Sequence, residues 1–422
     1  NSLVNSGIIE RPKLLGSYTV TFSLPGNTFD TALTYNTCKN LFINEVSTLG
    51  LMIMFFIGAL GGGLLMTGMV FAKTRKGYEE FKRLNTAMMC CLLLLQCALA
   101  LPPFDKWLFE GLFALPSHLA STARWTLLGG VVMNAAFFLR NLPVGVLFNN
   151  LESSKANIAT AVRIIFTLFC SFLFPRIGLT GAFYGLAVLT AGCILENLVM
   201  HHYAHAYIRA LPGNAGGEHI SLIEQLKFTL PLSFGGFLLM SSPLFVAAFV
   251  GMSDNPKAML AIHYVTVGLA NPIAYAALRM QAVAIEFPPK DSSDRNLTWY
   301  AVCVGILLGL IALVFTTDIV GDWYFGTFQN LPVNLIPTAK AAMGIYSFIA
   351  VIQALRARVE GIAAIARKPK AVMCGQISYV VSLFAVLAVL WHYSVPGWAM
   401  AVISISIAPI VTGITVSFCT RN

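Results

Sequence analysis

The most constraining feature of this sequence is an internal repeat that divides it into two halves. Phe22-Ser23-Leu24-Pro25 recurs 206 residues later as Phe228-Thr229-Leu230-Pro231. Two further patterns recur in the same order, at offsets of 215 or 216 residues: Arg140, Gly145 and Lys155-Ala156 return as Arg356, Gly361 and Lys370-Ala371, and Thr167-Leu168-Phe169 returns as Ser382-Leu383-Phe384. A nearly constant offset across separated patterns predicts two equivalent structural units.

Both units consist mainly of long apolar runs. The chain is 57% hydrophobic and 11% charged, with a mean hydropathy of +0.75, whereas about 25% of residues are charged in soluble domains. Runs of about 20 apolar residues are long enough to cross a bilayer core. The sequence predicts twelve spans, at 18–39, 46–72, 86–113, 123–149, 157–175, 178–207, 228–251, 258–286, 297–325, 336–365, 371–393 and 396–418.

We therefore expect an all-α polytopic membrane protein with two six-helix bundles related by a pseudo-two-fold axis. The expected divisions are an N-terminal tail (1–17), a first bundle (18–208), a linker with an amphipathic helix (209–227), a second bundle (228–418) and a short tail (419–422). The glycines and proline of residues 211–219 indicate a flexible connection between the bundles.

The basic residues predict the orientation in the membrane. The net charge is +9, but it is spread over short loops rather than gathered in one block, which argues against nucleic-acid binding. Alternate loops are the more basic ones, so both termini are expected in the cytoplasm and the protein in the plasma (inner) membrane. The loops expected inside carry Arg11, Lys13, Lys73, Arg75, Lys76, Lys82, Arg83, Lys155, Arg209, Lys227, Lys290, Arg295, Arg367, Lys368 and Lys370; those outside carry Lys39, Lys106, Arg124, Arg176 and Lys257.

The first span is unusually polar and contains Asn27 and Asp30 beside a Pro25-Gly26 pair. Such a helix must face protein or water, because a carboxylate at the bilayer centre costs about 2.5–3.5 kcal/mol. Asp30 either pairs with an arginine for packing or couples transport to a cation or proton. Pro25, Gly26 and Pro231 are expected to act as hinges, because a proline frees a backbone carbonyl and permits bending.

Arginines within the spans are the strongest chemical signal. They are Arg140, Arg163, Arg279, Arg356 and Arg358. Each stays charged and presents a planar fork that matches carboxylate or phosphate. Several arginines that converge would form a cavity attractive to anions. The alternative is that those near the span ends reach lipid phosphates.

Three acidic or titratable residues complete the candidate set. Glu360 shares a helical face with Gln353 and Arg356, and Glu196 in the sixth span is a further partner for the arginines. His263 is expected either to take part in ion coupling or to be a satisfied polar core residue.

No nucleotide-binding loop, catalytic triad or metal-ligand spacing is recognisable. His201 and His205 are four residues apart, but no cysteine or carboxylate accompanies them, so they are interpreted as interfacial histidines. The sequence therefore predicts neither an enzyme nor a cofactor. It favours energy supply from an ion gradient or from the substrate's own gradient.

Two sets of six spans, each opened by Phe-(Ser/Thr)-Leu-Pro, resemble the MOP superfamily, with its MATE-like fold. The stretches 51–56 and 69–75 look most like the second helix and basic loop of the progressive ankylosis branch. The stretches 105–140 and 356–370 are similar to that branch and to polysaccharide flippases.

The resemblance implies a V-shaped pair of bundles that alternates between inward-open and outward-open states. It also implies export of a phosphate-bearing or carboxylate anion, or flipping of a lipid-linked pyrophosphoryl sugar. The leading interpretation is thus an outward transporter or flippase for an anionic small molecule or lipid-linked substrate, surrounded by membrane lipids and acting as a monomer. A proton- or Na⁺-coupled exporter of cationic drugs that uses Asp30, and a non-transporting membrane scaffold, are the alternatives.

Overall fold

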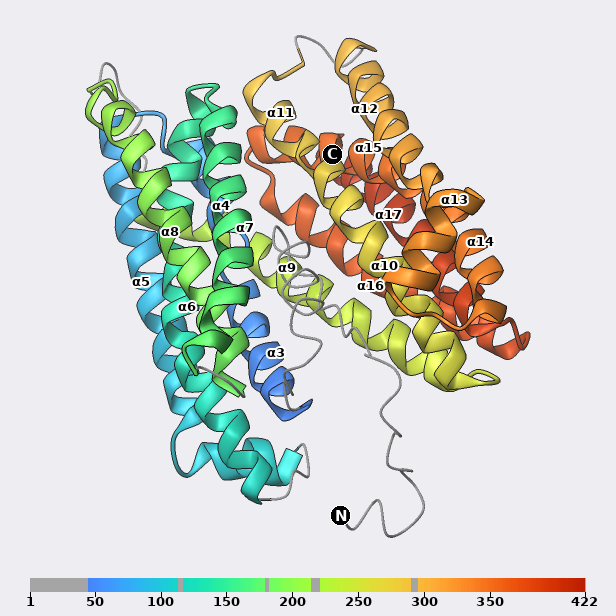
Figure 1. Cartoon of the computed structure of the whole chain (residues 1–422). Coiled ribbons are helices and arrows are strands. Elements are labelled where there is room, and N and C mark those ends of the chain that lie inside the picture. Colours follow the sequence, from blue (N-terminus) through green and yellow to red (C-terminus); the bar gives the residue numbers. More distant parts are fainter. Residues whose placement is uncertain (1–44, 113–116, 179–181, 214–220, 290–294, 422) are drawn as a thin grey trace.

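The computed structural model describes residues 45–112, 117–178, 182–213, 221–289 and 295–421 (Figure 1). These residues form helices joined by short connections, with no strand in the described ranges. The first predicted span, 18–39, lies outside them, and so do the candidate residues Asn27, Asp30, Pro25 and Gly26.

The first half contains α3 (Glu45–Ala59), α4 (Leu64–Phe71), α5 (Arg75–Ala100), the π-helix η1 (Lys106–Leu112), α6 (Ser117–Asn149), α7 (Ser153–Arg176) and α8 (Ala182–Arg209). The second half contains α9 (Leu222–Gly251), α10 (Pro256–Leu278), α11 (Met280–Glu286), α12 (Arg295–Val314), α13 (Asp318–Gly321), the π-helix η2 (Asp322–Phe328), the 3₁₀ turn η3 (Val333–Leu335), α14 (Ile336–Tyr346), α15 (Ile349–Ile365), α16 (Pro369–His392) and α17 (Gly397–Arg421).

Eleven helical stretches in the described ranges are long and apolar enough to cross a membrane. They correspond to the predicted spans from 46–72 onward. Large apolar side chains such as Leu94, Ile165 and Phe418 point outward from them. The predicted class, an all-α polytopic membrane protein, is confirmed.

Two predicted boundaries differ from the structure. The third span begins at Arg75 rather than at residue 86, because Thr74 caps the helix by accepting a hydrogen bond from the Gly77 amide (3.2 Å); it ends before Pro102-Pro103, which lack amide donors. The segment 222–227 is not a separate surface helix. It forms the first turns of α9, which Ser221 caps.

The two halves stand side by side, with α3–α8 on the left of Figure 1 and α10–α17 on the right. Helix α9 starts beside the first half and runs along α16 of the second. The second span is interrupted between α3 and α4, and the tip of this break contacts α9. A Cβ atom on Gly63 would lie 2.6 Å from the Thr229 carbonyl oxygen, so only glycine fits at this crossing.

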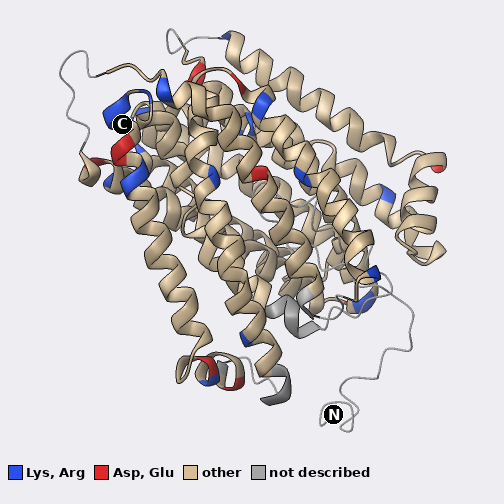
Figure 2. Ribbon diagram, turned by 60° about the vertical axis from the view of Figure 1, so that its left-hand side comes forward, with Lys and Arg blue, Asp and Glu red and all other residues tan. Residues whose placement is uncertain are grey.

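A single apolar core joins the halves at one end of the molecule. It combines Phe71, Leu147 and Ala204 of the first half with Phe228 and Ala364 of the second. All of these lie near the helix ends that the basic loops predict to be cytoplasmic; we call this the joined end. Charged residues gather at the two ends of the molecule and leave the middle largely uncharged (Figure 2). The few charges in the middle are therefore the candidates for function.

Candidate functional site

A buried carboxylate organises two of the predicted arginines in the first half. Glu196 of α8 is fully buried, and its Oε2 lies 3.1 Å from Arg163 Nη1 of α7 and 3.4 Å from Arg140 Nη1 of α6. The Thr160 hydroxyl donates a hydrogen bond to Glu196 Oε1 (2.7 Å). Three helices thus converge on one negative charge.

The close approach of α7 and α8 makes this arrangement possible. Gly192 precedes Glu196 by one turn on α8, and a Cβ atom there would lie 2.3 Å from the Thr167 hydroxyl and 3.2 Å from Arg163 Cγ. Any larger residue would push Arg163 away from Glu196. The buried pair therefore depends on a small residue at position 192.

Arg279 extends this cluster across the boundary between the halves. It sits at the end of α10, is exposed, and lies with its guanidinium carbon 6.0 Å from the ring centre of Phe148 on α6. The charges of Arg140, Arg163 and Glu196 act on it electrostatically. An exposed arginine in the middle of the apolar stretch 256–286, facing the other half, borders a space that solvent can reach.

The charge balance of this cluster is positive. Arg140, Arg163 and Arg279 present three guanidinium groups to the one carboxylate of Glu196. Arginine does not lose its proton in proteins, so the three charges are only partly compensated. Arg163 is buried, whereas Arg140 is partly exposed and Arg279 exposed, so the last two have donors available to a ligand.

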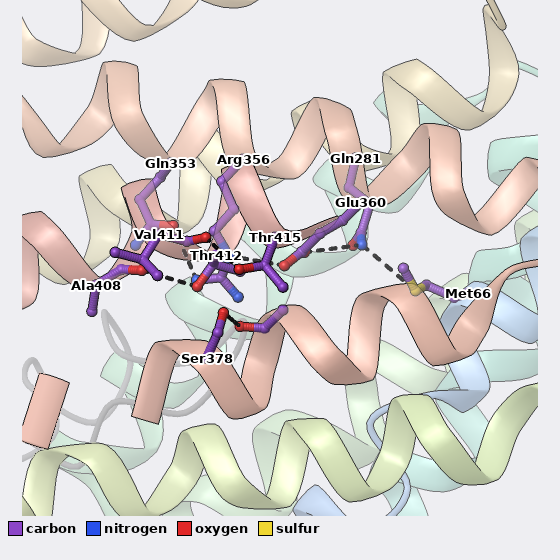
Figure 3. A network of polar contacts seen from close by, with 11 residues as sticks. Met66, Gln281, Gln353, Arg356, Glu360, Ser378, Ala408, Val411, Thr412 and Thr415 are labelled. Carbon is purple, nitrogen blue, oxygen red and sulfur yellow. Dashed lines mark hydrogen bonds and ion pairs between the residues drawn. The ribbon is translucent and has the colours of Figure 1, made fainter. Parts of the chain in front are cut away.

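A second polar cluster lies on α15 of the other half (Figure 3). Arg356 Nε lies 2.8 Å from Glu360 Oε1, and Arg356 Nη1 donates to Gln353 Oε1 at 3.4 Å. The guanidinium also lies 5.3 Å from the ring centre of Tyr379 on α16. The shared face predicted for Gln353, Arg356 and Glu360 is confirmed, and here one base meets one acid.

Gln281 connects this second cluster to the first half. Its Nε2 donates to Glu360 Oε2 at 3.4 Å and lies 3.5 Å from the sulfur of Met66 on α4. Gln281 is two residues after Arg279, so the junction between α10 and α11 adjoins both clusters. No signal in the sequence identified Gln281, Thr160 or Tyr379, because their partners lie on other helices.

The remaining predicted residues lie apart from these clusters. Arg358 is on α15, on a different face from Arg356, and is partly buried. His263 is buried in α10, and its Nδ1 has no hydrogen-bond partner within the described part of the chain. It precedes Arg279 by 16 residues, which is about 24 Å along a helix. No group of three metal-ligating side chains occurs among the residues that the structure describes.

Pro231 lies inside α9 at the crossing with α4. Thr229 and Ser233, on either side of it, make polar contacts to the first half: the Thr229 and Thr67 hydroxyls are 2.7 Å apart, and the Gly63 amide donates to the Ser233 hydroxyl at 3.2 Å. The predicted hinge therefore coincides with a hydrogen-bonded contact between the halves.

No protein-family model matches the sequence, and no curated protein matches it either. The fold, in contrast, is known. A MOP superfamily transporter from Pyrococcus furiosus, described by a reverse polarity of its binding pocket that suggests a different function, superposes with a TM-score of 0.65 at 14% identity, over 94% of this chain and 91% of that one.

Two further structures are similar. An outward-facing multidrug resistance MATE family transporter of the MOP superfamily has a TM-score of 0.67 at 14% identity, over 94% of this chain and 91% of the other. The eukaryotic MATE transporter AtDTX14 has a TM-score of 0.62 at 14% identity, over 93% of both chains. The progressive ankylosis and flippase branches stay predictions. At this level of identity the likeness concerns architecture, and the chain has the MATE fold of MOP superfamily transporters.

Proposed function

We propose that this protein is a secondary transporter for an anionic substrate, which it moves outward by alternating access. The observation that carries the proposal is the excess of guanidinium groups around Glu196 at the boundary between the halves. The substrate class is an organic anion or lipid-linked precursor that bears phosphate, pyrophosphate or carboxylate groups. These groups match the planar donors of arginine.

Arg140 and Arg279 are the residues that we assign to direct contact with the anion. They lie on α6 and at the end of α10, and neither is fully buried. Arg163 holds Glu196 in place and adds to the positive potential. An anion placed between the halves would touch both of them, so its binding favours one arrangement of the halves over another.

The second cluster supplies polar contacts rather than net charge. Arg356 and Glu360 neutralise each other, and Gln281 and Arg358 offer further donors near the same helix junction. Asp30 and His263 remain candidates for ion coupling, and Pro25, Gly26, Asn27 and Pro231 for hinge or substrate contacts.

The fold is consistent with either substrate polarity. The Pyrococcus furiosus relative is described by reverse polarity of its binding pocket, whereas other neighbours are described as multidrug transporters, so polarity differs among proteins of this fold. A proton- or Na⁺-coupled exporter of cationic drugs through Asp30 is the competing function. We favour the anion because two of three bases near Glu196 lack a compensating acid.

Transport by purified protein in liposomes tests the proposal. Arg279→Ala removes charge-assisted hydrogen bonds worth about 1.5–3 kcal/mol, so anion affinity should fall roughly ten- to a hundredfold. Arg279→Lys should restore only part of it, because lysine keeps the charge but loses the fork. Arg176→Ala, at the exposed end of α7, is the matched control and should transport normally.

The assay should compare three probes: inorganic pyrophosphate, a tricarboxylate, and a fluorescent lipid-linked pyrophosphate whose flipping is followed by bleaching. The first two identify a soluble anion and the third a lipid-linked one. If folded Arg279→Ala moves every anion unimpaired, and Asp30→Asn abolishes movement of a cationic dye, the protein is a cation exporter instead.

A further inference from the structure

The internal repeat extends to two short segments that the proposed function does not use. Trp107 and Trp323, Phe109 and Phe325, and Arg124 and Lys340 are each separated by 216 residues. This is the same offset that relates Arg140 to Arg356. One member of each pair lies in or next to η1 (Lys106–Leu112), and the other in or next to α13–η2 (Asp318–Phe328).

The two segments have the same structure and the same place in their halves. Each forms a π-helical turn between a span and the arginine-bearing span that follows: η1 connects α5 to α6, and α13–η2 connects α12 to α14. In both, the phenylalanine is fully buried, with Phe109 and Phe325 0% exposed. The tryptophan two residues earlier points outward, with Trp107 60% and Trp323 56% exposed.

An ion pair of the same polarity fastens each segment to the next helix. Arg124 of α6 lies 3.1 Å from Asp105. Lys340 of α14 lies 2.6 Å from Asp322 and 2.9 Å from Asp318. In each half the acid belongs to the segment and the base to the arginine-bearing span.

The exposed side of each segment continues the apolar surface of the spans. Leu94 of α5 and Leu310 of α12 are exposed on the helices that lead into the segments, and Phe104 and Ile319 are exposed beside the tryptophans. Exposed apolar residues on spans face lipid, and tryptophan concentrates where the acyl chains meet the headgroups. Lipid is therefore the occupant that fits this surface.

We propose that Asp105–Leu112 and Asp318–Phe328 are a matched pair of interfacial anchors, both seated in the headgroup region of one leaflet, at the end opposite the joined end. Each anchor fixes the depth of the span that follows it. Arg140 follows Arg124 by 16 residues, and Arg356 follows Lys340 by 16, which is about 24 Å of helix. The anchors thus hold Arg140 and Arg356 at one depth, far from the anchored surface.

Tryptophan quenching in liposomes tests this proposal. Three single-tryptophan versions of the full chain retain Trp107, Trp323 or Trp398 and have phenylalanine at the other positions. Trp398 is the control, because it packs against the core of the second half. The lipids are brominated either near the carbonyl end or near the methyl end of the acyl chain. Trp107 and Trp323 should lose more fluorescence to the shallow bromines, in the same ratio, and Trp398 should lose little to either.

Three outcomes would overturn the proposal. Quenching of either tryptophan by aqueous iodide but not by brominated lipid would place that segment in water. Quenching of only one would show that the anchors are not matched. Protection that disappears when protein is diluted in lipid would indicate a second copy of the chain as the occupant. In the otherwise unaltered protein, Trp107→Phe and Trp323→Phe should each remove an equal share of the lipid-quenched signal, so the comparison does not depend on the multiple variants folding.

Discussion

Arg163 and Glu196 form an ion pair of 3.1 Å, in which both side chains are almost completely buried. The carboxylate also contacts Arg140, so its removal would leave two bases without their common acid. A buried charge that loses its partner is destabilising by about 3–5 kcal/mol. The pair is therefore the most sensitive point of the first half.

Glu196→Gln should accordingly lower the melting temperature of the purified protein markedly. Glu79→Gln is the control, because Glu79 pairs with Arg75 on the exposed start of α5, and exposed pairs contribute about 0–1 kcal/mol. Equal melting temperatures for the two variants would show that Glu196 does not hold the arginines together.

The pair in the second half should respond differently to single and double replacement. Arg356→Met or Glu360→Gln alone leaves one buried charge, whereas the double variant leaves none. We expect each single variant to melt below the double variant, since replacement of a buried pair by neutral residues is often nearly neutral. A double variant less stable than both single variants would contradict this. Transport of the anion should persist in the double variant if the excess charge around Glu196 is the binding site.

The sequence predicted the helices well because the repeat and the apolar runs act over whole spans. It also predicted that Arg140 and Arg356 occupy equivalent positions. It could not predict their different partners. At the offset of 216, Glu196 corresponds to Thr412 and Glu360 to Val144. The acid has therefore moved from the last span of one half to the arginine-bearing span of the other.

The position of the excess charge follows from the same asymmetry. At an offset of 215, Arg163 corresponds to Ser378, which lies beside Arg356 in Figure 3. The second half thus has one base and one acid where the first half has two bases and one acid. Which side chains meet depends on helix rotation and on close approaches such as Gly192, and neither follows from residue types along a single chain.

Gly63→Ala should weaken the contact between the halves. The new Cβ atom would lie within 2.6–2.9 Å of the Thr229 carbonyl oxygen, Leu232 Cβ and the Ser233 hydroxyl. Overpacking of this kind destabilises by about 1–3 kcal/mol. Gly251→Ala is the matched control, because nothing lies within 4 Å of its Cβ position. Thermal melting should separate the two variants, and a Gly63→Ala protein as stable as the control would show that α4 and α9 do not pack this closely.

The anchor of the second half should respond to acid. The hydrogen bond and the positive charge from Lys340 lower the pKa of Asp318 below its ordinary 3.8. A carboxyl group with a lowered folded-state pKa stabilises the protein above its unfolded pKa and loses that effect as pH falls through the folded value. The difference in melting temperature between the natural protein and Asp318→Asn should therefore be small and constant near neutral pH and disappear below pH 3.8. Asp254→Asn, which removes an acid with no ion-pair partner in the described ranges, should show no such change; a difference for Asp318→Asn that persists in strong acid would exclude the contact.

The orientation of the molecule can be read from cysteine labelling on intact cells. Lys82 and Lys370 are exposed at the joined end, whereas Lys106 and Lys257 are exposed at the opposite end. Since basic loops stay in the cytoplasm, a membrane-impermeant maleimide should label Lys106→Cys and Lys257→Cys from outside but reach Lys82→Cys and Lys370→Cys only after permeabilisation. The nine native cysteines must first be replaced, with folding checked by melting. The sequon at Asn296-Leu297-Thr298 provides an independent control, because it should carry no glycan in a eukaryotic host. Labelling of Lys82→Cys or Lys370→Cys on intact cells would invert the protein and turn the joined end outward, so that the arginine cluster would open toward the cytoplasm.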